Sequence, residues 1–349
     1  MLRSKAKSQR VRGGRRVIIE WHTHVYPPEE AGDQPTFDGK SGPGWAGRCP
    51  MTVENVLDAH HKAGIDISVV SNAAHYMRGK AAADELKAIQ RWSDYAAEIQ
   101  NKYPGTLYGL ATILPCGGAA YVKEAERAIR ELGLKGLFIH SSHKGHYPDD
   151  DEARPFWELA QDLDVPVMIH PPHVGFGEER MREYRLASSI GRPADLCLAL
   201  SRLIVRGILE DFPRLKIVGS HGGGGLCEVI GRMDYAYELQ DEAYFLGPYA
   251  PMKIRHAPSH YLKMMYLDTV TYHPPAARLV VDTVGADHVL YGSDAPPLTS
   301  LKPRAIKLVE DLPLTARERE AVFWRNAAAL LKLPAAAAAA PAADTAPAA

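Results

Sequence analysis

The sequence predicts a (β/α)8 barrel, the α/β fold in which eight parallel strands alternate with eight helices. From Val17 onward, short runs of β-branched residues alternate with longer helical stretches, and eight such units precede Leu333. A chain of 349 residues is an ordinary length for one barrel of this kind. No linker divides residues 17–333, so we expect them to form one domain.

Each candidate strand is a short apolar run. The eight candidates are Val17 to His22, Asp66 to Ser71, Leu107 to Thr112, Leu134 to His140, Val165 to His170, Lys216 to His221, Tyr261 to Thr269 and His288 to Asp294. Helix start signals, such as Thr52 or a proline in a first turn, mark several intervening stretches. These stretches are Thr52 to Ala63, Ala81 to Asn101, Ala119 to Leu132, Glu152 to Leu163, Pro193 to Glu210, Pro274 to Val284 and Thr315 to Leu331.

The two ends of the chain differ in composition from the rest. Residues 1–16 are basic without an apolar segment, and we expect a disordered tail; a transit peptide is the weaker alternative. Residues 334–349 are mostly alanine and proline without an amphipathic face, which indicates a second disordered tail. The barrel domain is therefore expected to span residues 17–333.

The overall charge excludes some classes of partner. With 41 basic and 42 acidic residues the net charge is −1, so neither a nucleic acid nor an anionic membrane is favoured. No apolar run approaches the roughly 18 residues of a membrane span. The four cysteines are scattered and form no C-x-x-C pair, which is typical of reduced residues in a cytoplasmic protein. We therefore expect a cytoplasmic protein that binds a small molecule.

Two long loops rich in glycine and proline leave the carboxyl ends of predicted strands. Residues 25–50 follow the first strand, and residues 171–192 follow the fifth. The active sites of (β/α)8 barrels lie at this face of the sheet. The loops are therefore candidate lids and substrate walls; surface decoration is the alternative.

Four predicted strands carry, at their carboxyl ends, residues that bind metals or transfer protons: His22 and His24, His170, His221, and Asp294. Residues two apart in a strand point to the same face, so His22 and His24 can reach one ion. Because the strand ends of a barrel converge on its axis, His170 and Asp294 can complete the ligand set. The pattern predicts a mononuclear metal site.

Three imidazoles and one carboxylate suit Zn²⁺, which we predict, although Mn²⁺ and other divalent metals accept the same ligands. Such an ion would lower the pKa of a bound water toward about 7. His221 precedes four glycines, and these flexible surroundings favour a proton shuttle over a permanent ligand. The alternative is that the glycines only form a tight turn between strand and helix.

These motifs resemble the amidohydrolase superfamily. His22-x-His24, His170-Pro171, His221 with its glycines, and Gly292-Ser293-Asp294 look most like the branch that contains 2-amino-3-carboxymuconate-6-semialdehyde decarboxylase and related decarboxylases. The resemblance covers nearly all of residues 17–333 and is close across residues 203–235.

The resemblance implies roles for individual residues. His22, His24, His170 and Asp294 would be metal ligands, His221 the catalytic acid or base, and Asp294 would also exchange protons with the metal-bound water. Arg232 would bind a substrate carboxylate by reaching into the neighbouring subunit, which implies a homodimer.

Two further residues are candidates for contact with the substrate. Arg48, in the first long loop, is a candidate second carboxylate clamp or an ordinary surface charge. His173 follows a ligand histidine by three residues and is expected to line the pocket.

The chain departs from the family pattern at several positions. Glu20 replaces the usual aspartate, and we expect this longer side chain inside the barrel. Residues 295–298 lack the aromatic run that usually follows the aspartate, which leaves the substrate open. The fourth strand ends at His140 rather than at a bridging lysine, which favours a single metal ion.

Other polar residues have two interpretations each. The cluster His140, His143 and His146 is either a second metal site or a group of pocket histidines. Asp268 either orients a metal ligand or bonds to the backbone.

The predicted function is a zinc-dependent carboxy-lyase that removes CO₂ from a small aromatic or unsaturated carboxylic acid. Metal-bound water and His221 would deliver a proton to the carbon that bears the carboxylate. The alternative is a metal-dependent hydrolase of an amide, lactone or related bond, with metal hydroxide as the nucleophile. A metal-binding barrel without catalysis is a third interpretation.

Overall fold

The computed structural model describes residues 16–31, 51–73, 81–172, 175–242, 250–296 and 300–334. The predictions for the two tails therefore lie outside the described residues, except at Arg16 and Pro334. Arg16 belongs to the barrel: its guanidinium contacts Glu310 and lies 4.6 Å from the centre of the Phe323 ring.

Eight parallel strands form one sheet in chain order. They are β1 (Ile19–His24), β2 (Ile67–Ser71), β3 (Leu107–Thr112), β4 (Gly136–His140), β5 (Pro166–His170), β6 (Lys216–Gly219), β7 (Tyr266–Asp268) and β8 (Val289–Leu290). Trp21 N donates to Tyr291 O at 2.8 Å, so the chain leaving β8 lies beside β1. The predicted (β/α)8 barrel is confirmed.

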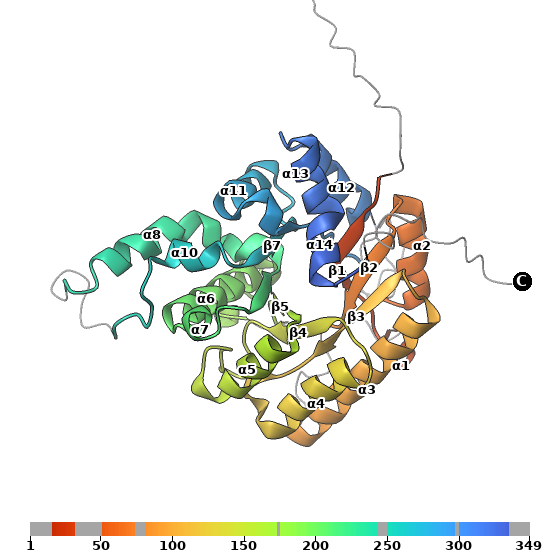
Figure 1. Ribbon diagram of the computed structural model, residues 1–349, viewed down its shortest axis with the longest axis horizontal. Helices are drawn as coiled ribbons and strands as arrows, with labels where there is room; N and C mark the ends of the chain where they lie inside the picture. Colours follow the sequence, from red (N-terminus) through yellow and green to blue (C-terminus); the bar gives the residue numbers. More distant parts are fainter. Residues whose placement is uncertain are drawn as a thin grey trace, which may run out of the picture.

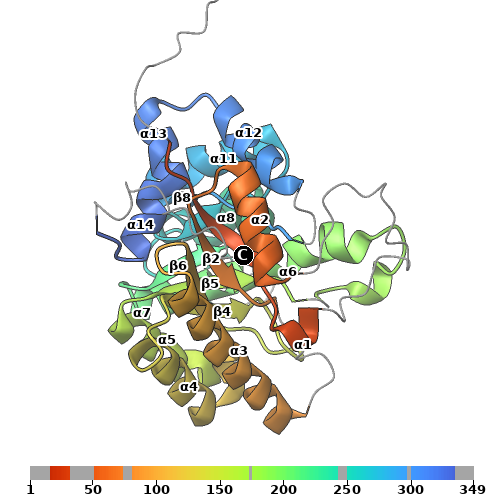
Figure 2. The same ribbon diagram turned by 90° about the vertical axis from the view of Figure 1, so that its right-hand side faces the viewer.

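Helices surround the strands, which lie at the centre of the molecule (Figures 1 and 2). They are α1 (Pro28–Ala31), α2 (Val53–Ala63), α3 (Ala82–Lys102), α4 (Ala119–Arg130), α5 (Arg154–Leu163), α6 (Arg192–Val205), α7 (Ile208–Asp211), α8 (Leu226–Glu238), α10 (Pro258–Leu262), α11 (Pro274–Val284), α12 (Leu301–Asp311), α13 (Ala316–Glu320) and α14 (Asn326–Leu330). No helix of the described residues is long and apolar enough to cross a membrane.

The apolar core has two layers, because successive strand residues point to opposite faces of the sheet. Val69 belongs to the cluster inside the barrel, while Val70 packs in the layer between the strands and the helices. Phe138 and Met168 fill the barrel from the opposite side, and α14 packs against this inner cluster.

Strand β1 contains an irregularity that decides where its side chains point. Its register against β2 shifts between Glu20 and Thr23. Trp21 packs inside the barrel, and His22 next to it also turns toward the barrel axis. A regular strand would place these neighbours on opposite faces. The bulge therefore lets His22 and His24 share the interior face above the apolar core.

The position predicted for Glu20 is wrong. Glu20 is fully buried, but it contacts Lys302 in α12 and lies 3.6 Å from the His60 ring in α2. Its side chain thus lies between β1 and the surrounding helices, not inside the barrel. The bulge explains the difference, since it changes the alternation that the prediction assumed.

Some secondary-structure elements differ from those predicted. The seventh strand is only Tyr266–Asp268, because Pro258 starts the short helix α10 in the region predicted as strand. Helices α8 and α12 were not among the predicted helices. Among the described cysteines, Cys116, Cys197 and Cys227 are free, as predicted, while Cys49 lies outside the described residues.

Candidate metal centre

Four predicted side chains meet at the carboxyl ends of the strands. His22, His24, His170 and Asp294 each offer one ligand atom, and these four atoms lie within 4.8 Å of one another. The shared carboxylate oxygen Oδ1 of Asp294 lies 3.3 Å from His22 Nε2 and 3.1 Å from His24 Nε2. The expected convergence of β1, β5 and the segment that follows β8 is therefore present.

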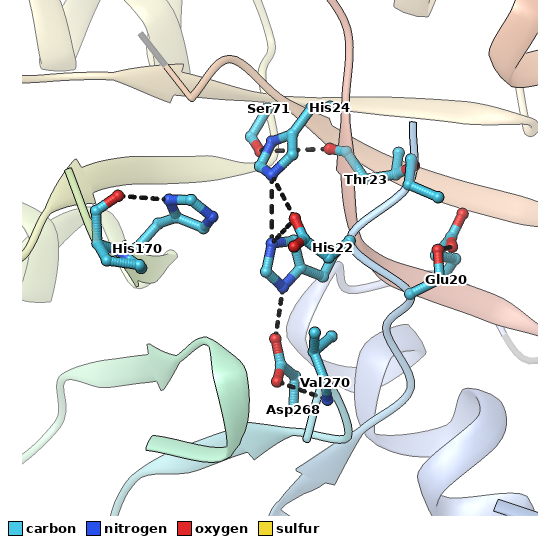
Figure 3. Close-up of polar contacts among 12 residues, drawn as sticks. Glu20, His22, Thr23, His24, Ser71, His170, Asp268 and Val270 are labelled. Atoms are coloured by element: carbon cyan, nitrogen blue, oxygen red, sulfur yellow. Dashed lines mark hydrogen bonds and ion pairs between the residues drawn. The ribbon is translucent and has the colours of Figure 1, made fainter. Parts of the chain in front are cut away.

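Hydrogen bonds on the far side of each imidazole fix its orientation (Figure 3). His22 Nδ1 donates to Asp268 Oδ2 at 2.6 Å, and His170 Nδ1 donates to the Pro171 carbonyl at 2.8 Å. Ser71 donates its hydroxyl to the Thr23 carbonyl at 3.3 Å, so it accepts from His24 Nδ1 at 3.1 Å. All three rings thus turn the Nε2 atom toward the cluster.

A buried set of three Nε2 lone pairs and one carboxylate requires a cation. The Nε2 atom of His170 is buried and has no hydrogen-bond partner among the residues that the structure describes. A second proton on the His22 ring would neutralise the charge of the Asp294 carboxylate. Burial disfavours this imidazolium, but the negative charges and hydrogen bonds of Asp294 and Asp268 outweigh burial and raise the pKa of His22 to about 10. The positive charge of the His22 ring in turn holds the pKa of Asp294 well below its ordinary value, although burial alone would raise it. A divalent metal fits this donor set.

His221 lies beside the four side chains without joining them. Its ring centroid is 5.0 Å from that of His22 and 5.1 Å from that of His170. Burial, above all other causes, lowers the pKa of His221 to about 4. Its imidazole is therefore neutral at pH 7 and able to accept a proton.

The glycines after His221 form a packed turn. Gly222 to Gly225 all have positive φ angles between 60° and 96°. A Cβ atom on Gly224 would lie 2.2 Å from the Pro193 carbonyl oxygen. The glycines therefore form a tight turn that is packed rather than flexible, and this turn is compatible with a proton-shuttle role for His221.

Asp268 at the end of β7 performs both functions that the sequence left open. Besides holding His22, its second oxygen accepts from Gly222 N and Val270 N, each at 3.0 Å. One buried carboxylate thereby positions a candidate ligand and the turn that carries His221.

Of the three residues predicted to contact the substrate, the structure describes Arg232. Arg232 lies on α8, which projects from the barrel together with α10, and its side chain is exposed (Figure 1). Arg48 and His173 lie outside the described residues.

The histidine cluster after β4 lines a cavity of about 330 Å³. His143 and His146 pair across a tight turn, and the buried carboxylate of Glu85 lies 3.2 Å from His143 Nε2 and 2.7 Å from Lys144 Nζ. Within the described part of the chain, no second group of three or more metal-competent side chains converges. The pocket interpretation of His140, His143 and His146 is therefore favoured over a second metal site.

Two residues near the centre were not predicted. The Tyr272 hydroxyl donates to Asp294 Oδ2 at 3.4 Å and to the Ser293 carbonyl at 3.3 Å. Burial lowers the pKa of Arg192, while the negative charge of Asp294 opposes this shift. Tyr272 lies in the connection after β7 and Arg192 is the first residue of α6, and at neither position does the sequence carry a periodic signal that marks a contact with Asp294.

Fold and site together define a class of protein: a (β/α)8 barrel with a buried His-x-His, His and Asp cluster at its carboxyl end. The Amidohydrolase family model matches residues 19–333. The chain belongs to this family, in agreement with the resemblance found in its motifs.

Comparisons with individual proteins support the same placement. The 2-amino-3-carboxymuconate-6-semialdehyde decarboxylase of Dictyostelium discoideum is 27% identical over 332 residues, which cover 87% of this chain and 89% of that protein. The crystal structure of 5-carboxyvanillate decarboxylase from Sphingomonas paucimobilis has a TM-score of 0.79 at 23% identity, covering 91% of this chain and 99% of that one.

A third relative was crystallised with a metal. A mutant of the 5-carboxyvanillate decarboxylase of Novosphingobium aromaticivorans, with bound manganese and 3-methoxy-4-hydroxy-5-nitrobenzoic acid, also has a TM-score of 0.79 at 23% identity, covering 91% of this chain and 97% of that one. At this identity the two crystal structures show that the fold is shared.

Proposed function

We propose that this protein is a metal-dependent decarboxylase of a small aromatic or unsaturated carboxylic acid. The observation that carries the proposal is the set of three oriented imidazoles and one carboxylate at the mouth of the barrel. The three proteins compared above are named as decarboxylases, which supports the reaction class. Zn²⁺ is our specific proposal for the metal; the manganese in the Novosphingobium structure makes Mn²⁺ the first alternative to test.

His22, His24, His170 and Asp294 would hold the metal. When bound, it would polarise an oxygen of the substrate and fix the acid beside His221. Asp268, Ser71 and the Pro171 carbonyl keep the three imidazoles in the required orientation. Because these partners are already in place, binding requires little rearrangement of the ligands.

His221 would transfer the proton. The negative charge of a bound carboxylate raises the pKa of the neutral imidazole and lets it take up a proton. The imidazolium then protonates the carbon that carries the carboxylate, using a π electron pair of the substrate. The C–C bond breaks, its electron pair restores the π system and CO₂ leaves. Each turnover consumes one proton, and His221 returns to its neutral form.

Arg232 would bind the substrate carboxylate of a neighbouring subunit, as in a homodimer. Its exposed position on the projecting helix α8 supports this role. Arg48 and His173 would contribute from the two long loops. An Arg232→Ala variant is expected to raise KM more than it lowers kcat, and sedimentation of the wild type should give a dimer mass. A monomer at assay concentration would contradict the role across subunits.

The experiment that tests the function uses metal-analysed protein with a panel of aromatic and unsaturated acids, amides and lactones. We expect CO₂ release from an acid, loss of activity with a chelator and its return with added Zn²⁺ or Mn²⁺. Hydrolysis without CO₂ would overturn the decarboxylase and favour the hydrolase. Activity that survives both chelation and a His170→Ala substitution would refute the metal centre.

A further inference from the structure

A buried ion pair lies behind the candidate metal centre, on the opposite side of β1. Lys302, the second residue of α12, and Glu20 of β1 both have fully buried side chains, and Lys302 Nζ bonds to Glu20 Oε2. His60 of α2 lies 3.6 Å from the same carboxylate oxygen. Neither Lys302 nor Glu20 faces the cluster of imidazoles.

The ion pair contacts the residues that flank the candidate metal ligands. Lys302 Nζ donates to Thr23 Oγ1 at 3.1 Å, and Thr23 is the residue between His22 and His24. Lys302 Nζ also donates to the Ala295 carbonyl at 3.4 Å, and Ala295 directly follows Asp294.

Two further hydrogen bonds join the same segments. Ser293, which directly precedes Asp294, donates its hydroxyl to Glu20 Oε1. Thr23 Oγ1 donates to the Ala295 carbonyl. The ion pair thus holds both neighbours of Asp294 and the residue between the two histidines of β1.

Asp294 needs such support because its backbone has a φ angle of 57°, in the left-handed region. A residue other than glycine adopts this conformation only where its surroundings hold it there. Asp294 N donates to the His22 carbonyl at 3.0 Å, which aligns the two segments but does not fix the direction of the carboxylate. The contacts to Ser293 and Ala295 restrain the chain on either side.

We propose that Lys302, with Glu20, is a positioning residue for the metal centre: it fixes the spacing between the His22-x-His24 segment of β1 and Asp294. The role rests on the metal centre proposed above, but it is tested by metal binding and not by decarboxylation. Through Thr23 and Ala295, one ammonium group connects three of the four candidate ligands. The same contacts distinguish this ion pair from one that only joins α12 to β1.

Three variants separate positioning from general stability. Thr23→Val keeps the ion pair and the shape of the side chain but removes two hydrogen bonds of the Thr23 hydroxyl, the one it accepts from Lys302 and the one it donates to the Ala295 carbonyl. Lys302→Met removes the links from the ammonium group to Thr23 and Ala295 and leaves the Glu20 carboxylate buried without its partner. The double variant Glu20→Gln/Lys302→Met removes that lone charge while the links stay broken. Lys307→Met, in the exposed i,i+4 pair with Asp311 of the same helix, is the matched control.

For each full-length variant, the dissociation constants for Zn²⁺ and Mn²⁺ are measured by competition with a chromophoric chelator, and the melting temperature is measured on metal-free protein. We expect Thr23→Val to raise the metal dissociation constant about tenfold and to lower the melting temperature less than Lys302→Met does, because the ion pair itself stays intact. Lys302→Met should lower the melting temperature and raise the constant by about 10- to 100-fold. The double variant should regain melting temperature but keep the weakened metal binding.

Two results would overturn the positioning role. One is a double variant whose metal affinity recovers together with its melting temperature, since the pair would then only stabilise the fold. The other is wild-type affinity in Thr23→Val. A wild-type chain that binds neither Zn²⁺ nor Mn²⁺ would refute the metal centre itself, and with it this role of Lys302.

Discussion

Substitution of Asp268 by asparagine tests how the protein sets the tautomer of His22. The carboxylate uses Oδ2 to accept from His22 Nδ1 and Oδ1 to accept from the amides of Gly222 and Val270. An asparagine has one acceptor and one donor at these two positions. Whichever way the amide turns, one side of the site loses its acceptor.

Each orientation of the asparagine side chain disrupts a different part of the site. If its oxygen faces His22, its NH₂ group meets two backbone N–H donors and the turn that carries His221 is pushed away. If its NH₂ group faces His22, the ring must accept at Nδ1 and carry its proton on Nε2, which removes the lone pair needed for a metal. Loss of such a supporting group weakens metal binding by about 10- to 100-fold, or roughly 1.4 to 2.7 kcal/mol.

The assay measures the Zn²⁺ and Mn²⁺ affinity of Asp268→Asn against wild type, with the decarboxylation rate at saturating metal as the second readout. We expect weaker metal binding and a kcat that stays low after the site is filled, because His221 is also displaced. Asp268→Glu is the companion variant, since it keeps the charge but misplaces it. Wild-type metal affinity in Asp268→Asn would refute the argument that this carboxylate sets the orientation of His22.

Four further predictions concern single residues. His170→Ala should reduce metal affinity by at least about 100-fold, as measured by chelator competition, whereas a smaller loss would exclude it as a ligand. His221→Ala should keep its metal content by elemental analysis while kcat falls by about 10²- to 10⁴-fold; loss of metal would instead make His221 a ligand. Gly224→Ala should lower the free energy of unfolding in urea by roughly 3 kcal/mol or more, because its Cβ would meet a carbonyl oxygen at 2.2 Å with φ at 66°; an unchanged midpoint would contradict this packing. For Glu20, burial alone would raise the pKa, but Lys302 and His60 outweigh burial and lower it from 4.5 to about 2. A lowered pKa adds stability that is complete above about pH 5 and is lost as the pH falls toward 2, an effect of roughly 3 kcal/mol that Glu20→Gln should lack in acid unfolding curves.

The sequence predicted the barrel and the four converging side chains because both follow from local patterns. Apolar runs and start signals mark the units, and a parallel barrel brings the ends of distant strands together whatever their separation in the chain. His170 and Asp294 could therefore be placed with His22 without knowledge of any contact. Helix α8 was not among the predicted helices, although Leu226, Ile230, Met233 and Tyr237 recur at helical spacing on the face that packs against the core.

The contacts that support the site could not be predicted in this way. Lys302 is 282 residues from Glu20, and a lysine in a helix is ordinarily a surface residue. Asp268 could be named but not assigned, because its two roles depend on the position of Gly222 in the turn that follows the neighbouring strand β6. These contacts arise from tertiary packing, which leaves no periodic signal in the sequence.

The bulge in β1 connects the candidate metal centre with the ion pair behind it. In a regular strand Trp21 would point inward and His22 outward, and the His-x-His pair would face the helices. The extra residue allows Trp21 and His22 to point inward in succession, so that Glu20 and Thr23 both turn toward α12. One irregularity thus gives the interior two imidazoles and gives Lys302 two partners on the outer face. Removal of the ion pair should therefore disturb the bulge first, and through it the spacing of His22 and His24, before it disturbs the remainder of the barrel.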